Sequence, residues 1–111
     1  MDSDDATEKI NEHLFGSNIE MIKVEKGRIV FPDGSSEPGK VREISTDKKD
    51  GKNIVTVVLE PKKEGNVERQ KTIIITYSSK ERHIHWDIKT KKTTTTIDTI
   101  GTKEPLNVGK R

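Results

Sequence analysis

The chain has 111 residues, of which 28% are hydrophobic and 36% charged, and its formal net charge is +2. This composition predicts one folded domain with a thin core, because both the net charge and the share of large aliphatic residues fall outside the range typical of disorder. Basic and acidic residues alternate along the chain, which is typical of a solvated surface. We therefore expect no nucleic-acid partner.

The chain contains no cysteine, which excludes disulfides, thiol nucleophiles and zinc sites that use cysteine ligands. No apolar run approaches the roughly 18 residues of a membrane span, and no signal peptide is visible, so we expect a soluble protein without a transmembrane segment. The compartment stays open, since both a cytoplasmic protein and the mature domain of an exported cell-envelope protein fit these observations.

The kinds of apolar residue favour β-structure. The chain has 13 Ile, 8 Val and 12 Thr but only 3 Leu and 1 Ala. β-Branched side chains are restricted at χ1 and suit a pleated sheet better than a helix, whereas a helical protein would use Leu and Ala. We therefore predict a mostly β fold.

One short helix is predicted at residues 4–15, after a mobile N-terminus at residues 1–3. Asp4 or Asp5 can cap this helix, and Ile10 and Leu14 stand four residues apart on one face. Gly16 is a typical residue at the end of a helix. A helix of this length is marginal alone, so we expect its apolar face to dock on the rest of the domain.

About seven strands follow, separated by short segments rich in Gly, Pro, Asp and Lys. They are predicted at residues 18–24, 28–31, 40–46, 53–60, 67–77, 81–90 and 93–100. Short loops favour an antiparallel meander, and the twist of so many strands predicts a barrel or half-barrel. One β-rich domain then covers residues 4–100, with an extended tail at 101–111. The predicted core contains Ile19 or Met21, Ile29, Phe31, Val41, Val55, Val57, Leu59, Ile73, Ile75, Tyr77, Ile84, Trp86 and Ile88.

A row of possible metal ligands lies in the sixth predicted strand. Because side chains alternate between the faces of a strand, His83, His85 and Asp87 share one face there. Two imidazoles and a carboxylate could hold a divalent metal ion if a neighbouring strand supplied a fourth ligand. The alternative is that these three polar residues form the solvated face of the strand, and this alternative is favoured.

The last predicted strand, residues 93–100, carries Thr on both faces. Such a strand is typical of a sheet edge, where unpaired backbone groups can pair with another chain. Thr94, Thr96 and Asp98 are the candidate residues of this interaction edge, which could form a homodimer.

We predict no catalytic residues, no enzymatic activity and no cofactor. The chain lacks a nucleophile elbow and a phosphate-binding glycine motif, and its serine pairs fall in predicted turns. The remaining function classes are binding or structural ones.

The N-terminal half resembles bacterial lipocalin-like domains. The resemblance lies in Leu14-Phe15-Gly16, the strand that contains Ile19 to Ile22, and the segment from Gly27 to Gly34 with Phe31 near its end. It implies a small barrel that holds a small apolar ligand, often in an exported lipoprotein. The family usually has Trp after the first Gly, whereas this chain has Ser17. A lipocalin-like binding module, a protein-interaction module with an exposed edge and a metal-binding protein are the three functions that remain open; the ligand-binding residues stay unknown.

Overall fold

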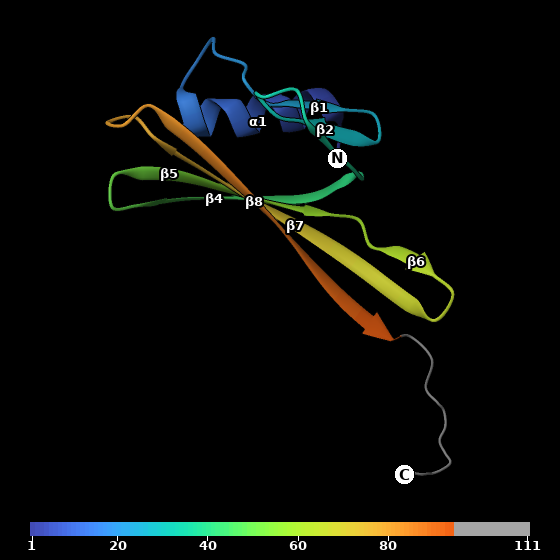
Figure 1. Ribbon diagram of the computed structural model, residues 1–111. Coiled ribbons are helices and arrows are strands. Elements are labelled where there is room, and N and C mark those ends of the chain that lie inside the picture. The colour runs from blue at the N-terminus through green and yellow to red at the C-terminus, as the bar shows by residue number, and fades with distance from the viewer. Residues whose placement is uncertain (95–111) are drawn as a thin grey trace.

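Residues 1–94 are the part of the chain that the computed structural model describes, and they form one helix and eight strands in two antiparallel sheets (Figure 1). Helix α1 (Ser3–Phe15) is followed by a small sheet of three strands and a larger sheet of five. The predictions of a mostly β fold and of one N-terminal helix are therefore confirmed. No helix among these residues is long and apolar enough to cross a membrane.

The N-cap of helix α1 lies two or three residues before the predicted cap. Asp2 is the N-cap, and its Oδ1 accepts a hydrogen bond from the Asp4 N–H at 2.8 Å, so Asp4 and Asp5 lie in the first turn, where their charges favour the helix dipole. The helix ends where the Gly16 N–H donates to the Glu12 carbonyl at 3.0 Å, with Gly16 at a positive φ of 90°.

The small sheet has the order β1 (Lys23–Glu25), β2 (Arg28–Val30) and β3 (Ser36–Pro38). The turn between β2 and β3 is held by Asp33, whose Oδ1 accepts hydrogen bonds from the Ser35 hydroxyl at 2.6 Å and the Ser35 N–H at 2.9 Å. These bonds favour the ionised carboxylate and lower the pKa of Asp33. The first predicted strand, 18–24, is thus mostly a connecting segment, and β3 was not predicted.

The large sheet contains β4 (Val41–Lys49), β5 (Lys52–Leu59), β6 (Lys62–Glu64), β7 (Val67–Ser78) and β8 (His83–Thr94). Strands β5 and β6 follow one another along the same side of β7, where β5 pairs with the segment from Thr72 and β6 with Val67–Arg69. Pro61 lies between them and cannot donate a backbone hydrogen bond. Strand β8 pairs with the other side of β7 along its whole length.

The large sheet is therefore a meander, as predicted, but it is open. Strand β4 lies at one side and β8 at the other, and no pairing joins them within residues 1–94. Only three strand spacings separate the two sides, and a twist of about 20–25° per strand does not bring them together. Neither sheet closes into the barrel or half-barrel that the sequence suggested, because β1, β2 and β3 form a sheet of their own.

The turn predicted at Lys91-Lys92 is wrong, since β8 continues through both residues to Thr94. Lys91 and Lys92 pair with Gln70 and Arg69 on β7, and a Lys-Lys pair has no preference for the positive φ angles of a tight hairpin. By contrast, the turn between β4 and β5 uses Asp50 and Gly51, whose φ angles are 54° and 78°. The rest of the predicted last strand, residues 95–100, lies outside the described residues, as does the predicted tail.

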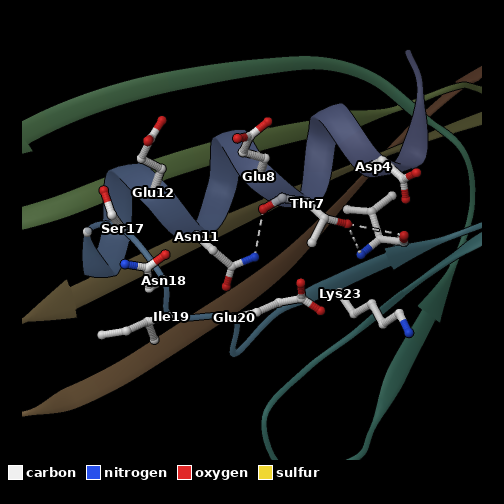
Figure 2. A pocket seen from close by; sticks show the side chains of 12 residues that line it. Asp4, Thr7, Glu8, Asn11, Glu12, Ser17, Asn18, Ile19, Glu20 and Lys23 are labelled. Atoms are coloured by element: carbon white, nitrogen blue, oxygen red, sulfur yellow. Dashed lines mark hydrogen bonds between the residues drawn. The ribbon is translucent and has the colours of Figure 1, made fainter.

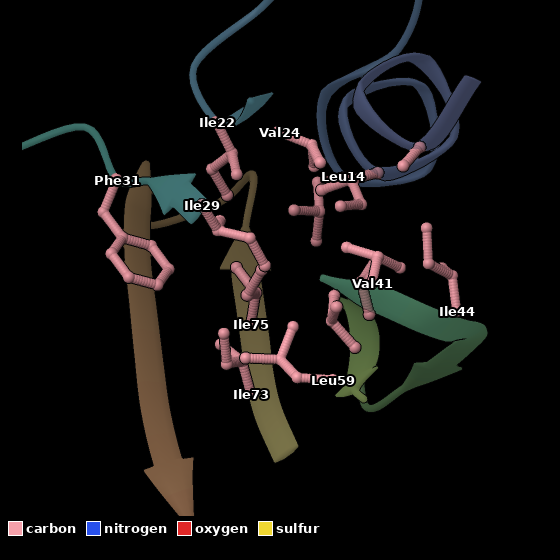
Figure 3. Close-up of a cluster of buried hydrophobic side chains, with 14 residues drawn as sticks. Leu14, Ile22, Val24, Ile29, Phe31, Val41, Ile44, Leu59, Ile73 and Ile75 are labelled. Carbon is pink, nitrogen blue, oxygen red and sulfur yellow. The ribbon is translucent and has the colours of Figure 1, made fainter. Parts of the chain in front are cut away.

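The core lies between one face of the large sheet and a cover made by α1 and the small sheet (Figure 3). Two aromatic pairs join these layers. Phe31 stacks on Trp86 with ring centroids 5.0 Å apart, and Phe15 meets Tyr77 edge to face at 4.9 Å. The buried hydrophobic residues are Ala6, Ile10, Leu14, Ile22, Val24, Ile29, Phe31, Val41, Ile44, Val55, Val57, Leu59, Ile73 and Ile75.

Three predicted core residues lie at the surface. Ile19 and Met21 are 48% and 45% exposed, and Ile22 is buried in their place because the Asn11 side chain holds this segment with Ile22 facing the helix. Ile88 is 38% exposed, since it lies on the edge strand beyond the stacked Trp86.

Candidate functional site

The two faces of the large sheet differ. The face toward α1 carries the core, whereas no element of residues 1–94 covers the opposite face (Figure 1). The strand register places six β-branched side chains in the centre of this uncovered face, and all six are half-buried by their neighbours. We call these residues the open face: Ile54, Thr56 and Val58 on β5, and Thr72, Ile74 and Thr76 on β7.

The open face has an ordered arrangement across the strands. Ile54 pairs with Thr76, Thr56 with Ile74, and Val58 with Thr72, so each pair places an aliphatic side chain beside a threonine. β-Branched pairs of this kind pack well on a pleated surface. The open face is therefore a shaped, mainly methyl-bearing surface with hydroxyl groups distributed over it.

Acidic residues flank the open face on one side and basic residues on the other. On β4, Glu43 pairs with Val58 and Asp47 with Ile54, which gives an acidic rim. On β8, His85 pairs with Thr76 and Lys89 with Thr72, which gives a basic rim. All four rim residues are exposed. An apolar centre with a polar rim is typical of a protein-binding surface.

Ser45 and Asp87 lie between these rim charges. Ser45 on β4 pairs with Thr56, and Asp87 on β8 pairs with Ile74. The row that crosses the middle of the sheet thus has a neutral residue at one rim and an acid at the other.

The predicted metal row, His83, His85 and Asp87, lies on β8 beside the open face. As expected, all three side chains share one face of the strand, and all are exposed. Their nearest cross-strand neighbours on β7 are Ser78, Thr76 and Ile74. No cluster of three or more His, Cys, Asp or Glu side chains in residues 1–94 is arranged to hold a metal ion. The metal site stays a prediction.

Thr94 is the last residue of β8 and pairs with Val67, while Thr96 and Asp98 lie outside the described residues. The described sheet edge is β8 itself, which pairs with β7 on one side only within residues 83–94. Lysines at 89, 91 and 92 lie along its second half, where such charges discourage pairing with another strand.

A groove of about 740 Å³ runs between α1 and the segment that leads into β1 (Figure 2). Asp4, Glu8 and Glu12 line it from the helix, and Glu20 and Lys23 line it from the opposite side. Its floor contains Thr7 and Asn11, which are both buried.

The polar groups of this floor bind the backbone of the protein. Asn11 Nδ2 donates to the Ile22 carbonyl at 2.6 Å, and its Oδ1 accepts the N–H groups of Met21 and Ile22 at 2.8 and 2.9 Å. The Thr7 hydroxyl accepts the Val24 N–H at 2.9 Å. Asn11 follows Thr7 by one helical turn, and Val24 follows Ile22 by two positions of extended chain, so that both steps span about 6–7 Å. The groove is therefore explained by the docking of α1 on β1.

A second groove, of about 470 Å³, lies where the corner before β4 meets β6 and β7. Arg69 and Lys71 line it, but Arg69 pairs with Glu64, and Lys71 with Glu37, so these charges are compensated within the chain. We assign no ligand to it.

The open face was not found from the sequence, although a signal for it was present. The runs from Ile54 to Leu59 and from Ile73 to Ile75 are apolar on both faces of a strand, not on one. In a sheet with one face covered, the second set of apolar residues must lie on the other face.

No family model, curated protein or solved structure matches the chain. Conclusions about function therefore depend on the geometry of these surfaces.

Proposed function

We propose that this protein is a non-catalytic protein-interaction module and that the open face is its contact surface. The observation that carries this proposal is the absence of any cover, within residues 1–94, over six half-buried β-branched side chains at the centre of the large sheet. The sheet already has a complete core on its other face, so these side chains are not needed to hold the helix or the small sheet.

The chemistry of the open face supports a protein partner. Its centre has no charged side chain, and its hydroxyl groups belong to threonines that also present methyl groups. Charged residues stand at both rims, where they can orient a partner without being desolvated at the centre.

The exposed edge of β8 is the second candidate surface, and its one-sided pairing along 12 residues favours it. A partner strand could add to this edge by main-chain hydrogen bonds. The three lysines in the second half of β8 oppose such pairing, so we rank the edge below the open face.

The lipocalin-like function remains a proposal with less support. It depends on the helix followed by a meander, and it requires a barrel with an internal cavity for an apolar ligand. The two grooves described above, of about 740 and 470 Å³, are lined mainly by charged and polar side chains. Native mass spectrometry of the purified protein tests this function directly, since a retained small molecule adds mass and an empty chain does not.

A photo-crosslinking experiment tests the proposed interaction. Thr56, at the centre of the open face, is replaced by a photoreactive phenylalanine analogue in cells that make the protein, and Lys26, in the exposed turn before β2, is replaced in a control variant. We expect a covalent protein adduct from position 56 and none from position 26. Equal adducts from both positions, or no adduct from position 56, would contradict an interaction through the open face.

A further inference from the structure

We infer that the partner of the open face is a second copy of this chain, bound face to face about a two-fold axis parallel to the strands. This inference rests on the proposed function, because it names the occupant of the same surface. The evidence for a second copy is the charge pattern of the two rims, which is complementary to itself in this one arrangement.

The strand register defines the charge pattern. Crossing the sheet from β4 to β8, one row reads Glu43, Val58, Thr72 and Lys89, and another reads Asp47, Ile54, Thr76 and His85. In both rows the acid lies on β4 and the basic residue on β8. The acidic rim and the basic rim are thus on opposite sides of the open face, at the same heights along the strands.

A two-fold axis parallel to the strands places the acidic rim of the second copy over the basic rim of the first. Residues that face each other then lie at the same height along the strands. Glu43 of one copy then faces Lys89 of the second copy, and Asp47 faces His85 of the second copy. The symmetry repeats both pairs, so four complementary contacts surround the apolar centre. Asp87 faces Ser45 of the second copy, which carries no charge.

The alternative face-to-face arrangement is unfavourable. A two-fold axis across the strands places β4 on β4 and β8 on β8, so that Glu43 faces Asp47 of the second copy and Lys89 faces His85. Like charges opposed in an interface oppose association, and this discriminates between the two orientations.

The centre of the open face also fits a second copy. About the axis parallel to the strands, each aliphatic side chain faces a threonine: Ile54 meets Thr76, Thr56 meets Ile74, and Val58 meets Thr72 of the second copy. Two sheets can then pack at the usual separation of about 10 Å, with large side chains of one copy beside smaller ones of the other.

The size of the surface predicts a weak, reversible dimer. Four strands about 4.8 Å apart and three rows about 6.8 Å apart give a face on the order of 400 Å² per copy. The total of about 800 Å² lies below the range of standard specific interfaces, where weak and transient contacts are found. Association should therefore depend on concentration and on salt, which weakens the contacts between the rims.

Disulfide crosslinking tests this dimer. Because the chain contains no cysteine, any disulfide must join the introduced residues. The variant Glu43→Cys/Lys89→Cys can form disulfides only between copies, because three strand spacings, about 14 Å, separate these residues within one chain and a disulfide spans at most about 7 Å between Cα atoms. We expect a covalent dimer under mild oxidation. The matched control is Lys48→Cys/Lys89→Cys, since Lys48 is exposed on β4 but belongs to the face toward the helix, and we expect it to remain monomeric.

Charge reversal supplies a second test that does not depend on oxidation. Sedimentation of the full chain from about 1 µM to about 1 mM should show a dimer at high concentration. Lys89→Glu should raise the dimer dissociation constant by about ten-fold, and Glu43→Lys/Lys89→Glu should restore the original value. Trp86 fluorescence checks that each variant is folded.

Several outcomes would overturn the inference. A chain that stays monomeric over this concentration range, with no disulfide in the first variant, excludes a second copy as the occupant. If Glu43→Cys/Asp47→Cys forms a covalent dimer and Glu43→Cys/Lys89→Cys does not, the two-fold axis lies across the strands, and the axis parallel to the strands is excluded. If position 56 photo-crosslinks to a different protein or to another part of its own chain, the second copy is again excluded. Of these outcomes, only an adduct with a different protein leaves the proposed interaction function in place. If position 56 gives no protein adduct, the proposed interaction function is excluded as well.

Discussion

At the scale of single residues, the docking of α1 depends on two buried polar side chains. The carboxamide of Asn11 has the same donor and acceptor groups as a peptide bond, and it pairs with both the N–H and the carbonyl of Ile22. Thr7 makes the equivalent contact with Val24. Side chains of the helix thus satisfy backbone groups of Ile22 and Val24 that would otherwise be buried and unpaired.

Replacing Asn11 by Ala should therefore destabilise the protein strongly. The change leaves the Ile22 backbone groups without these hydrogen bonds, and we expect the free energy of unfolding to fall by about 2–3 kcal/mol. Urea denaturation followed by Trp86 fluorescence measures this loss. The control is Glu12→Ala, an exposed neighbour on the same helix, which should change stability by less than about 0.5 kcal/mol. Equal losses in the two variants would show that Asn11 does not anchor the helix.

At the scale of elements, the corner between β3 and β4 sets where the small sheet meets the large one. Gly39 lies in this corner with a φ of 142°, and its N–H donates to the Gly27 carbonyl at 2.9 Å. A Cβ atom at this position would lie 2.8 Å from Cδ1 of the buried Leu59. Both the backbone angle and the close approach of β5 therefore require glycine.

The variant Gly39→Ala should lower the free energy of unfolding by about 2–4 kcal/mol, since backbone strain and overpacking against Leu59 add. Gly65→Ala is the matched control. Gly65 also has a positive φ, of 64°, but no atom lies within 4 Å of an added Cβ, so we expect a loss of only about 1 kcal/mol. Thermal denaturation of both variants gives the comparison, and an equal cost would mean that Leu59 moves freely to accept the methyl group.

At the scale of the whole molecule, two layers are joined by aromatic contacts from distant parts of the chain. Phe31 comes from the end of β2 and stacks on Trp86 of β8, while Phe15 at the end of α1 contacts Tyr77 of β7. The small sheet has strands of three residues each and cannot be stable by itself. We therefore expect the helix, the small sheet and the large sheet to unfold together.

Phe31→Ala tests this coupling. Loss of the ring should cost about 3–5 kcal/mol and should shift the emission of Trp86, the only tryptophan, toward that of a solvated indole. The exposed Met21→Ala is the control and should leave the emission unchanged. Secondary structure and Trp86 emission should be lost in a single transition. Two separate transitions would show that the layers unfold independently.

The sequence predicted much of this fold because many of its signals are local. The helix follows from the acids near its start, the 10/14 spacing and Gly16, and the meander from alternating Ile and Val between polar turns. The faces of residues 19–24 could not be predicted, because Met21-Ile22 offers an apolar residue on either face and only the contact with Asn11 selects Ile22. The open face depends on strand register, and one sequence does not show which side of a doubly apolar strand is covered.

Strand β7 has a consequence for the order in which the protein can form. It pairs with β5, β6 and β8, and its Ile73 and Ile75 complete the core under a helix that begins at Ser3. During synthesis the helix and the small sheet leave the ribosome before the large sheet, and Ile73 and Ile75, which complete the core beneath them, are encoded some 70 residues after the start of the helix. We therefore expect the nascent chain to remain unfolded until β7 has emerged, and then to fold in one step, since the contacts within residues 3–38 bury too little apolar surface before the large sheet is present.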